Sequence, residues 1–139
     1  MDGFFFEDLA LGQSASFAKT ITEADILLFS AVSGDTNPVH INAEAAAASM
    51  FKERIAHGML SASLISTVLG TRLPGPGTIY LGQNLKFKAP VRIGETVTAT
   101  ATITALDPAR KRATLSTICT VAGRTVIDGE ATVMVSSRP

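Results

Sequence analysis

A chain of 139 residues, 46% of them apolar and 17% charged, has the size and composition of one domain, so we expect a single domain over residues 1–139. Its 12 lysines and arginines balance its 12 aspartates and glutamates, which leaves no net field to attract nucleic acid or an anionic membrane and favours association with another subunit. The one cysteine, Cys119, excludes an internal disulfide and a cysteine-rich zinc site, and it fits a reducing compartment.

The apolar run Phe4–Phe6 near the N-terminus does not have the pattern of a signal peptide. Asp2 precedes the run, Glu7 follows it, and no basic region is present. The longest other apolar stretch, residues 59–69, is interrupted by serines and is too short to span a bilayer. We therefore expect a cytoplasmic protein without a membrane partner.

The first half of the chain predicts helices. After an expected strand at about residues 13–21, Thr22 and Asp25 have the spacing of a capping box, in which each side chain binds the other residue's backbone N–H. A helix should therefore begin there and run to about Ser33. Its inward-facing apolar residues are expected to be Ile26, Leu27 and Phe29.

A loop is expected at residues 35–40. Gly34 supplies an end signal for the preceding helix, and Asn37-Pro38 forbids its regular continuation. A short helix should follow at about residues 43–51, where a run of alanines supplies helix propensity.

Residues 58–70 predict a second long helix, apolar on nearly every side with small serines between the apolar residues. A helix of that kind belongs inside the protein. The prolines and glycines of residues 74–77 end it, because proline cannot continue a helix and glycine accepts turn conformations.

The second half of the chain alternates with the period of β-strands. The clearest apolar set is Val97, Ala99, Ala101 and Ile103, with threonines between them. Turn signals divide four strands, at about residues 78–90, 95–106, 112–121 and 125–135. Helices followed by strands predict an α+β fold, with the helices gathered on one face of an antiparallel sheet.

Asp35 and His40 are the first candidates for chemistry. A proline-stiffened loop can hold a carboxylate and an imidazole close enough to share one water, and a carboxylate buried beside an apolar helix becomes a stronger base. The alternative is that Asp35 caps the turn and His40 is a packing residue, since aspartate in such loops usually serves the backbone.

Gly58 is the second candidate, because it opens the long apolar helix. The first N–H groups of a helix lack intrahelical partners and lie at its positive end, so they can bind a developing oxyanion. Glycine also lets a substrate approach closely. The alternative is that Gly58 merely admits a tight turn, with His57 capping the helix or packing.

In order and spacing, these segments resemble the MaoC-like (R)-specific enoyl-CoA hydratases. The resemblance is carried by Asp35–His40, His57–Leu60 and Ile79–Phe87 ahead of Pro90-Val91, and it extends over nearly the whole chain. It is strongest with the short single-domain members that supply monomers for polyhydroxyalkanoate synthesis. It implies a hot-dog fold, an antiparallel sheet wrapped around a long central helix, and a homodimer with active sites at the subunit interface.

The implied activity is that of a hydro-lyase, which adds water to trans-2-enoyl-CoA in fatty acid or polyhydroxyalkanoate metabolism. By the resemblance, Asp35 and His40 hold the water and return its proton to C2 in a syn addition that gives the (R)-3-hydroxyacyl thioester. The N–H of Gly58 matches the donor to the thioester carbonyl. Ser66 matches a serine near the catalytic pair and is assigned an orienting role, unless it is simply a small residue on a packed helix.

Coenzyme A is expected as the carrier of the substrate, with no metal and no bound cofactor. Its phosphates have candidate partners in Lys86, Lys88 and Arg92, or in the turn Arg110–Arg112, although ordinary surface charge explains both groups. Leu69 and Val133 are candidates for the wall of the acyl pocket, with core packing as the alternative.

Other activities share this fold, so the fold alone does not identify the reaction. The alternatives are an acyl-CoA thioesterase, an acyl-carrier-protein dehydratase and a non-catalytic acyl-CoA binding protein. By the resemblance, the Asp35 and His40 pair argues against a thioesterase. The intact pair together with Gly58 argues against a binding protein.

Overall fold

A computed structural model describes residues 2–139. After a 3-10 turn at Phe6–Asp8 come strand β1 (Ser14–Thr20), helices α1 (Glu23–Ser33), α2 (Pro38–Ile41), α3 (Ala43–Ala47) and α4 (Gly58–Thr71), and strands β2 (Ile79–Phe87), β3 (Thr96–Asp107), β4 (Arg112–Val121) and β5 (Arg124–Met134). The strands and the two long helices expected from the sequence are confirmed to within a few residues.

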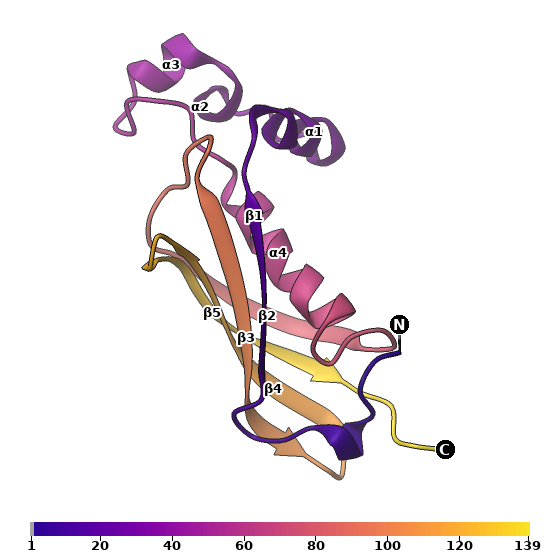
Figure 1. The fold of residues 1–139 in the computed structure, drawn as a ribbon. Helices are drawn as coiled ribbons and strands as arrows, with labels where there is room; N and C mark the ends of the chain where they lie inside the picture. The colour runs from indigo at the N-terminus through magenta and orange to yellow at the C-terminus, as the bar shows by residue number, and fades with distance from the viewer. Residues whose placement is uncertain (1) are drawn as a thin grey trace.

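The five strands form one antiparallel sheet in the order β1-β3-β4-β5-β2. Helix α4 lies along one face of this sheet and packs on β1, β3 and β4, as Figure 1 shows. An α+β hot-dog arrangement, with a sheet curved around a long helix, is thereby confirmed.

The core lies between α4 and the inner face of the sheet. On β3 the alternating residues Val97 and Ala99 are fully buried, and Ile65 and Val68 of α4 are 2% and 0% exposed. Burial of each large apolar side chain contributes roughly 1.5–3 kcal/mol. The outer face is polar, and its hydroxyls pair across strands, as between Ser16 Oγ and Thr100 Oγ1 at 2.8 Å.

The expected loop at residues 35–40 is partly wrong, because residues Pro38–Ile41 form the helical turn α2. The Asn37 side chain accepts a hydrogen bond from the backbone N–H of Val39 at 3.2 Å and so caps this turn. Proline is favoured at the first helical position, where its missing N–H would have no partner anyway. Pro38 therefore starts α2, whereas α1 has already ended at Ser33, with Gly34 as its C-cap.

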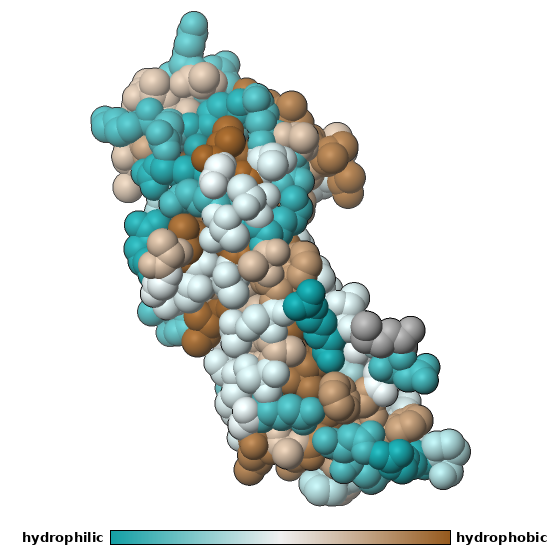
Figure 2. All heavy atoms as spheres, in the orientation of Figure 1, coloured by the Kyte–Doolittle hydropathy of each residue, from teal (hydrophilic) through white to brown (hydrophobic). Residues whose placement is uncertain are grey.

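Two expectations about helix faces are also corrected. Leu27 is 49% exposed and does not point inward, because the buried residues of α1 are Ile26 and Ser30. Helix α4 is not covered on every side, since Met59 is 56% exposed and Ser66 lies on the same uncovered stripe. Brown apolar spheres at the upper right of Figure 2 lie where Figure 1 places α1.

Helices α1, α2 and α3 gather at one end of the molecule, beside the N-terminus of α4, whereas the turn between β3 and β4 lies at the opposite end (Figure 1). This arrangement brings the loop after α1 to the first turn of α4. Within residues 2–139, no helix combines the length and the apolar character needed to cross a bilayer.

Candidate active site

The loop after α1 holds Asp35 through a series of short-range hydrogen bonds. Helix α1 ends at Gly34 in the left-handed conformation, with φ of 78°, which glycine adopts without strain. The backbone N–H of Asp35 donates to Ser33 Oγ at 3.1 Å, and Asp35 Oδ1 accepts from the N–H of Asn37 at 3.2 Å. One carboxylate oxygen therefore serves the turn, as one sequence interpretation expected, and Oδ2 remains available to a ligand.

His40 lies on α2 with a defined tautomer. Its Nδ1 is 2.8 Å from the carbonyl oxygen of Ile55, and because a carbonyl can only accept, Nδ1 carries the proton and donates. In the neutral ring Nε2 then has the free lone pair. Arg54 fixes the backbone of His40 by donating from Nε to its carbonyl at 2.7 Å, and it pairs with Glu23 of α1 at 2.6 Å.

His57 packs directly against His40. The two rings are stacked with centroids 3.9 Å apart and planes 28° from parallel. His57 Nε2 lies 3.0 Å from the backbone oxygen of Asp35 and 3.1 Å from Ser30 Oγ, and the ring is only 2% exposed. His57 therefore touches the ring of one candidate catalytic residue and the backbone of the other.

A carboxylate oxygen of Asp35 and ring nitrogens of His40 and His57 lie within 4.8 Å of one another. Such a set could in principle hold a metal ion. Ring nitrogens bind metals along lone pairs that lie in the ring plane, and two nearly parallel stacked rings do not direct them to a common point. Because His40 Nδ1 is engaged with the Ile55 carbonyl, Nε2 is the ring nitrogen of His40 that is left for a ligand beside Asp35.

Gly58 is confirmed as the first residue of α4. A Cβ atom at this position would lie 2.6 Å from the ring of Phe87, so only glycine allows this ring to pack against the first turn. The backbone N–H groups at the start of α4 have no partner within the helix and lie at its positive end. They can donate to a ligand that carries negative charge.

A cavity of about 540 Å³ opens beside this first turn. Its wall is mainly apolar and includes Phe51, Phe87 and Ile127. The residues of its wall that bring polar side chains or a free backbone donor are Asp35, His57, Gly58, Ser61 and Lys88. An apolar cavity of this size with a few polar groups can take a small-molecule acyl chain. His40 lies behind this wall, reaching the site through its proximity to Asp35.

Other residues predicted for the site lie elsewhere. Ser66 lines a second cavity of about 560 Å³, between α4 and β2, and is not part of the wall that contains Asp35. Leu69 and Val133 are 1% and 0% exposed and belong to the hydrophobic core. In the part of the chain that the structure describes, this favours the core-packing alternative for both.

The basic candidates are separated by the fold. Lys88 lines the first cavity, and Lys86 is exposed on the neighbouring strand β2. Arg92 forms an ion pair with Glu53 at 2.8 Å, which partly neutralises its charge. The turn Arg110–Arg112, between β3 and β4, lies at the opposite end of the sheet from helices α1 and α2 (Figure 1).

Sequence reasoning missed three contributors to the site. The contacts of His57 with His40 and Asp35 could not be read from spacing, because His40 lies on α2 and His57 immediately precedes α4, and only the tertiary fold brings them together. Ser30 carries no motif. Ser61 was noticed only as a small residue among apolar ones, although a serine on the buried side of an apolar helix is a signal that its hydroxyl needs a partner.

Comparison with known proteins agrees with this geometry. Residues 8–129 match the family described as MaoC like domain. The chain is 66% identical over 134 residues to an (R)-specific enoyl-CoA hydratase of Rhodospirillum rubrum, which covers 96% of this chain and 93% of that protein.

Two solved structures are also similar. The unliganded R-hydratase PhaJ1 from Pseudomonas aeruginosa has a TM-score of 0.93 at 46% identity, covering 98% of this chain and 88% of that one. The (R)-hydratase of Aeromonas caviae involved in PHA biosynthesis has a TM-score of 0.90 at 44% identity, covering 93% and 98%. With a family match over most of its length and relatives this similar, the chain belongs to the MaoC-like family.

Proposed function

We propose that this chain is an (R)-specific enoyl-CoA hydratase, which adds water reversibly to trans-2-enoyl-CoA to give (R)-3-hydroxyacyl-CoA. One observation carries the proposal: the Asp35 carboxylate and the His40 ring lie together beside the first turn of α4, next to an apolar cavity. The similarity to named hydratases supports the same reaction. The catalytic unit is one MaoC-like domain over residues 1–139.

The mechanism follows from the tautomer of His40. In the proposed reaction, a water bound between Asp35 and His40 loses a proton to the free lone pair of His40 Nε2 while its oxygen bonds to C3 of the enoyl thioester. The C2–C3 π electrons move toward the thioester oxygen and then accept a proton at C2. Because the Asp35 and His40 pair handles both steps on one face of the substrate, the addition is syn.

The Gly58 N–H donates to the thioester oxygen as negative charge develops there. A placed general acid or base contributes roughly a hundredfold to ten-thousandfold in rate. One oxyanion donor contributes about a hundredfold to a thousandfold. Together these two effects multiply to roughly 10⁴–10⁷ without a metal or prosthetic group, and we infer that none is needed.

The carrier is coenzyme A, whose phosphates require cations. Lys88 is the strongest candidate, because it lines the cavity and pairs with no carboxylate among the described residues. Lys86 is exposed nearby and can add positive charge that attracts the same phosphates. Arg92 contributes less, because Glu53 already occupies its guanidinium.

We further infer a homodimer. Strand β2 is an edge strand, paired only with β5, and it exposes apolar side chains such as Ile79 and Leu81, 50% and 44% exposed. Exposed apolar edges of this kind promote pairing with another chain. Asp35 is also exposed in one chain, so its own helices do not supply the burial that we expected. Sedimentation at twice the 14.5 kDa chain mass supports this inference, and sedimentation at that mass contradicts it.

A cytoplasmic location and a role in fatty acid or polyhydroxyalkanoate metabolism complete the proposal. The name of the Aeromonas caviae protein supports the PHA role. The state of the one cysteine is compatible with that location. Cys119 is a free and buried thiol, and burial raises its pKa to about 11, so it is neither reactive nor available for a disulfide.

The test is the loss of enoyl-thioester absorbance when the purified protein meets crotonyl-CoA. The configuration of the product is read with (R)-specific and (S)-specific 3-hydroxyacyl-CoA dehydrogenases. Rapid loss that gives the (R) product supports the proposal. Release of free thiol indicates a thioesterase, turnover of acyl-carrier-protein thioesters alone indicates the dehydratase, and stabilisation by acyl-CoA without turnover indicates a binding protein.

A further inference from the structure

Ser61 is a buried serine with an unpartnered hydroxyl at the candidate active site. It lies on α4 one turn after Gly58, is 1% exposed and lines the same cavity as Gly58 and Asp35. Its Oγ is inaccessible in the free chain and has no hydrogen-bond partner among the described residues. A buried hydroxyl without a protein partner lowers the stability of the folded state, and at the edge of a cavity it can bond a ligand.

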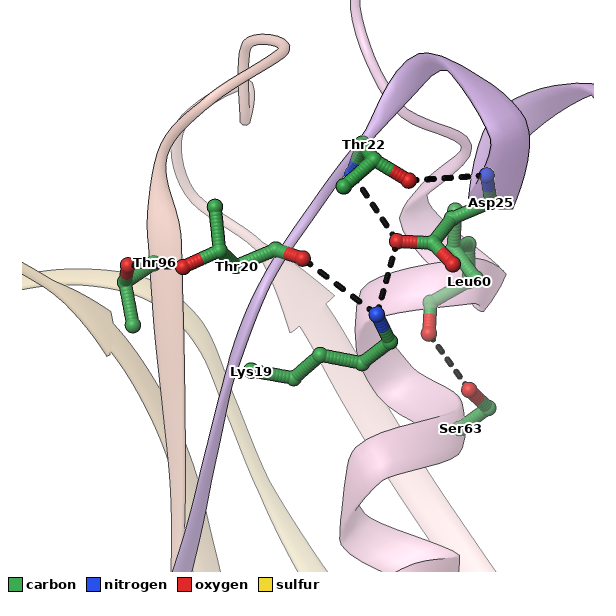
Figure 3. Close-up of polar contacts among 7 residues, drawn as sticks. All are labelled: Lys19, Thr20, Thr22, Asp25, Leu60, Ser63 and Thr96. Carbon is green, nitrogen blue, oxygen red and sulfur yellow. Dashed lines mark hydrogen bonds and ion pairs between the residues drawn. The ribbon is translucent and has the colours of Figure 1, made fainter.

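Other hydroxyls of α4 do not share this condition. Ser63 Oγ donates to the carbonyl oxygen of Leu60 at 2.6 Å, as Figure 3 shows, and Thr71 Oγ1 donates to the carbonyl of Thr67 at 2.6 Å. Serine and threonine in helices commonly bond back to the preceding turn in this way. Ser61 could reach the carbonyl of His57 by the same route and does not do so.

The position of Ser61 relative to Gly58 suggests what it binds. Residues three apart are neighbours on one helix face, and helical side chains lean toward the N-terminus. The Ser61 hydroxyl therefore leans toward the turn whose free N–H groups we assign to the thioester oxygen. Of the other polar side chains in the wall, Asp35 can only accept, and Lys88 is assigned to the phosphates of coenzyme A.

His57 is the remaining polar residue of the wall, and its ring does not replace Ser61 as a donor. Its Nε2 is already engaged with Ser30 Oγ and the backbone of Asp35. With the proton on Nε2, its Nδ1 is an acceptor. Ser61 is then the neutral side-chain donor of the wall.

We propose that Ser61 Oγ donates a second hydrogen bond to the carbonyl oxygen of the enoyl thioester, beside the Gly58 N–H, so that the oxyanion site has two donors. This inference rests on the proposed hydratase function and assigns a further residue to it. Two donors share the negative charge as it develops, so removing Ser61 slows the chemical step more than it weakens binding of the substrate.

The test compares Ser61→Ala with Thr71→Val, which removes an exposed hydroxyl from the same helix far from the cavity. For Ser61→Ala we expect kcat with crotonyl-CoA to fall about tenfold to a hundredfold, with KM changed by less than about threefold. The melting temperature should stay the same or rise, because an unpaired buried hydroxyl is gone. Thr71→Val should keep the wild-type kcat and KM.

A vibrational measurement separates a hydrogen bond to the substrate from a purely structural role. In an Asp35→Asn background, which keeps the substrate intact, bound crotonyl-CoA labelled with carbon-13 at the thioester carbonyl should absorb at a lower frequency than free substrate. Adding Ser61→Ala should remove part of this shift. Ser61→Cys, which replaces the hydroxyl with a slightly larger and weaker donor, should give an intermediate shift and an intermediate kcat. It replaces Ser61→Ala in the test if the alanine variant does not fold.

Wild-type kcat in Ser61→Ala together with an unchanged carbonyl frequency would overturn the role of Ser61. Failure of the wild-type protein to hydrate any enoyl thioester is a different outcome. It would contradict the proposed function, while the carbonyl shift of bound thioester would still decide whether Ser61 is a donor.

Discussion

The sheet and the helical end of the molecule, residues 23–61, satisfy their polar groups to different degrees. Strands β3, β4 and β5 pair along their lengths, and their inward residues, such as Leu115, are fully buried. The helical end contains three of the four unpaired buried side-chain atoms found among the described residues, on Arg54, His57 and Ser61. The sheet therefore has its inward side chains packed in the core, whereas most of the unpaired buried polar atoms lie at the helical end, where the candidate active site is.

The largest expected effect is on catalysis, at the helical end. Asp35→Asn and His40→Ala should each lower kcat by about a hundredfold to ten-thousandfold or more, because each removes a group that transfers a proton. Asparagine can still accept the N–H of Asn37, so the turn should persist. The rate of crotonyl-CoA hydration measures the loss of kcat, and circular dichroism of the same samples shows whether the fold is kept.

Near-normal turnover in either variant would contradict the assignment of the pair. Loss of the fold in Asp35→Asn would contradict the division of roles between the helical end and the sheet, because an exposed carboxylate would then be supporting the core.

The second prediction concerns the sheet, where a substitution should lower stability and leave catalysis unchanged. Leu115→Ala should lower the free energy of unfolding by about 2–5 kcal/mol, because it leaves a cavity against α4, while kcat per folded molecule stays near the wild-type value. Ile118→Ala on the same strand is the control, since Ile118 is only partly buried on the outer face and should cost less. Urea unfolding measures both variants. A large loss of kcat in folded Leu115→Ala would show that the core also shapes the site.

The third prediction concerns His57, which we regard as a positioning residue because it contacts the His40 ring and the Asp35 backbone. His57→Phe keeps an aromatic ring against His40 but removes the hydrogen bonds to the Asp35 backbone and to Ser30. We expect kcat to fall about tenfold with little change in KM, as for a small displacement of a catalytic group. Ser30→Ala removes only one of the two hydrogen-bond partners of His57 Nε2 and should lower kcat less than His57→Phe does. Equal kcat in wild type and His57→Phe would mean that ring stacking alone positions the pair.

Local signals predicted much of this fold and part of the site. The period-two pattern of β3, the capping box of Thr22 and Asp25, and the helix start at Gly58 depend on residues close in sequence, and all three are confirmed. Burial of Leu27 was wrong because periodicity cannot tell which of two apolar faces of a short helix meets the core.

The remaining features depend on contacts between distant parts of the chain. Stacking of His40 on His57 needs α2 to meet the start of α4, and the cavity needs Phe87 and Ile127 from two strands. The unpaired state of the Ser61 hydroxyl is visible only once the partners around it are known. No spacing in the sequence reports these facts.

The smallest expected effect concerns Asp25, at the start of α1, where the chain passes from strand β1 to the helical end (Figure 3). Asp25 accepts from Lys19 Nζ at 2.9 Å and from the N–H of Thr22 at 2.8 Å, and its own N–H donates to Thr22 Oγ1 at 3.2 Å. The hydrogen bond from Lys19, followed by that from Thr22, lowers the pKa of the Asp25 carboxyl.

A lowered pKa in the folded state means that this carboxylate stabilises the protein above the ordinary aspartate value of about 3.9, and that the contribution is lost as pH falls through the folded pKa. Asp25→Asn should therefore lower the free energy of unfolding by about 1 kcal/mol at neutral pH. Below about pH 4 the difference from wild type should shrink. Urea unfolding at a series of pH values measures it. A difference that stays constant with pH would assign the effect to the hydrogen bonds of the capping box and not to the charge of Asp25. The ion pair of Asp25 with Lys19 of β1 would then contribute nothing to stability.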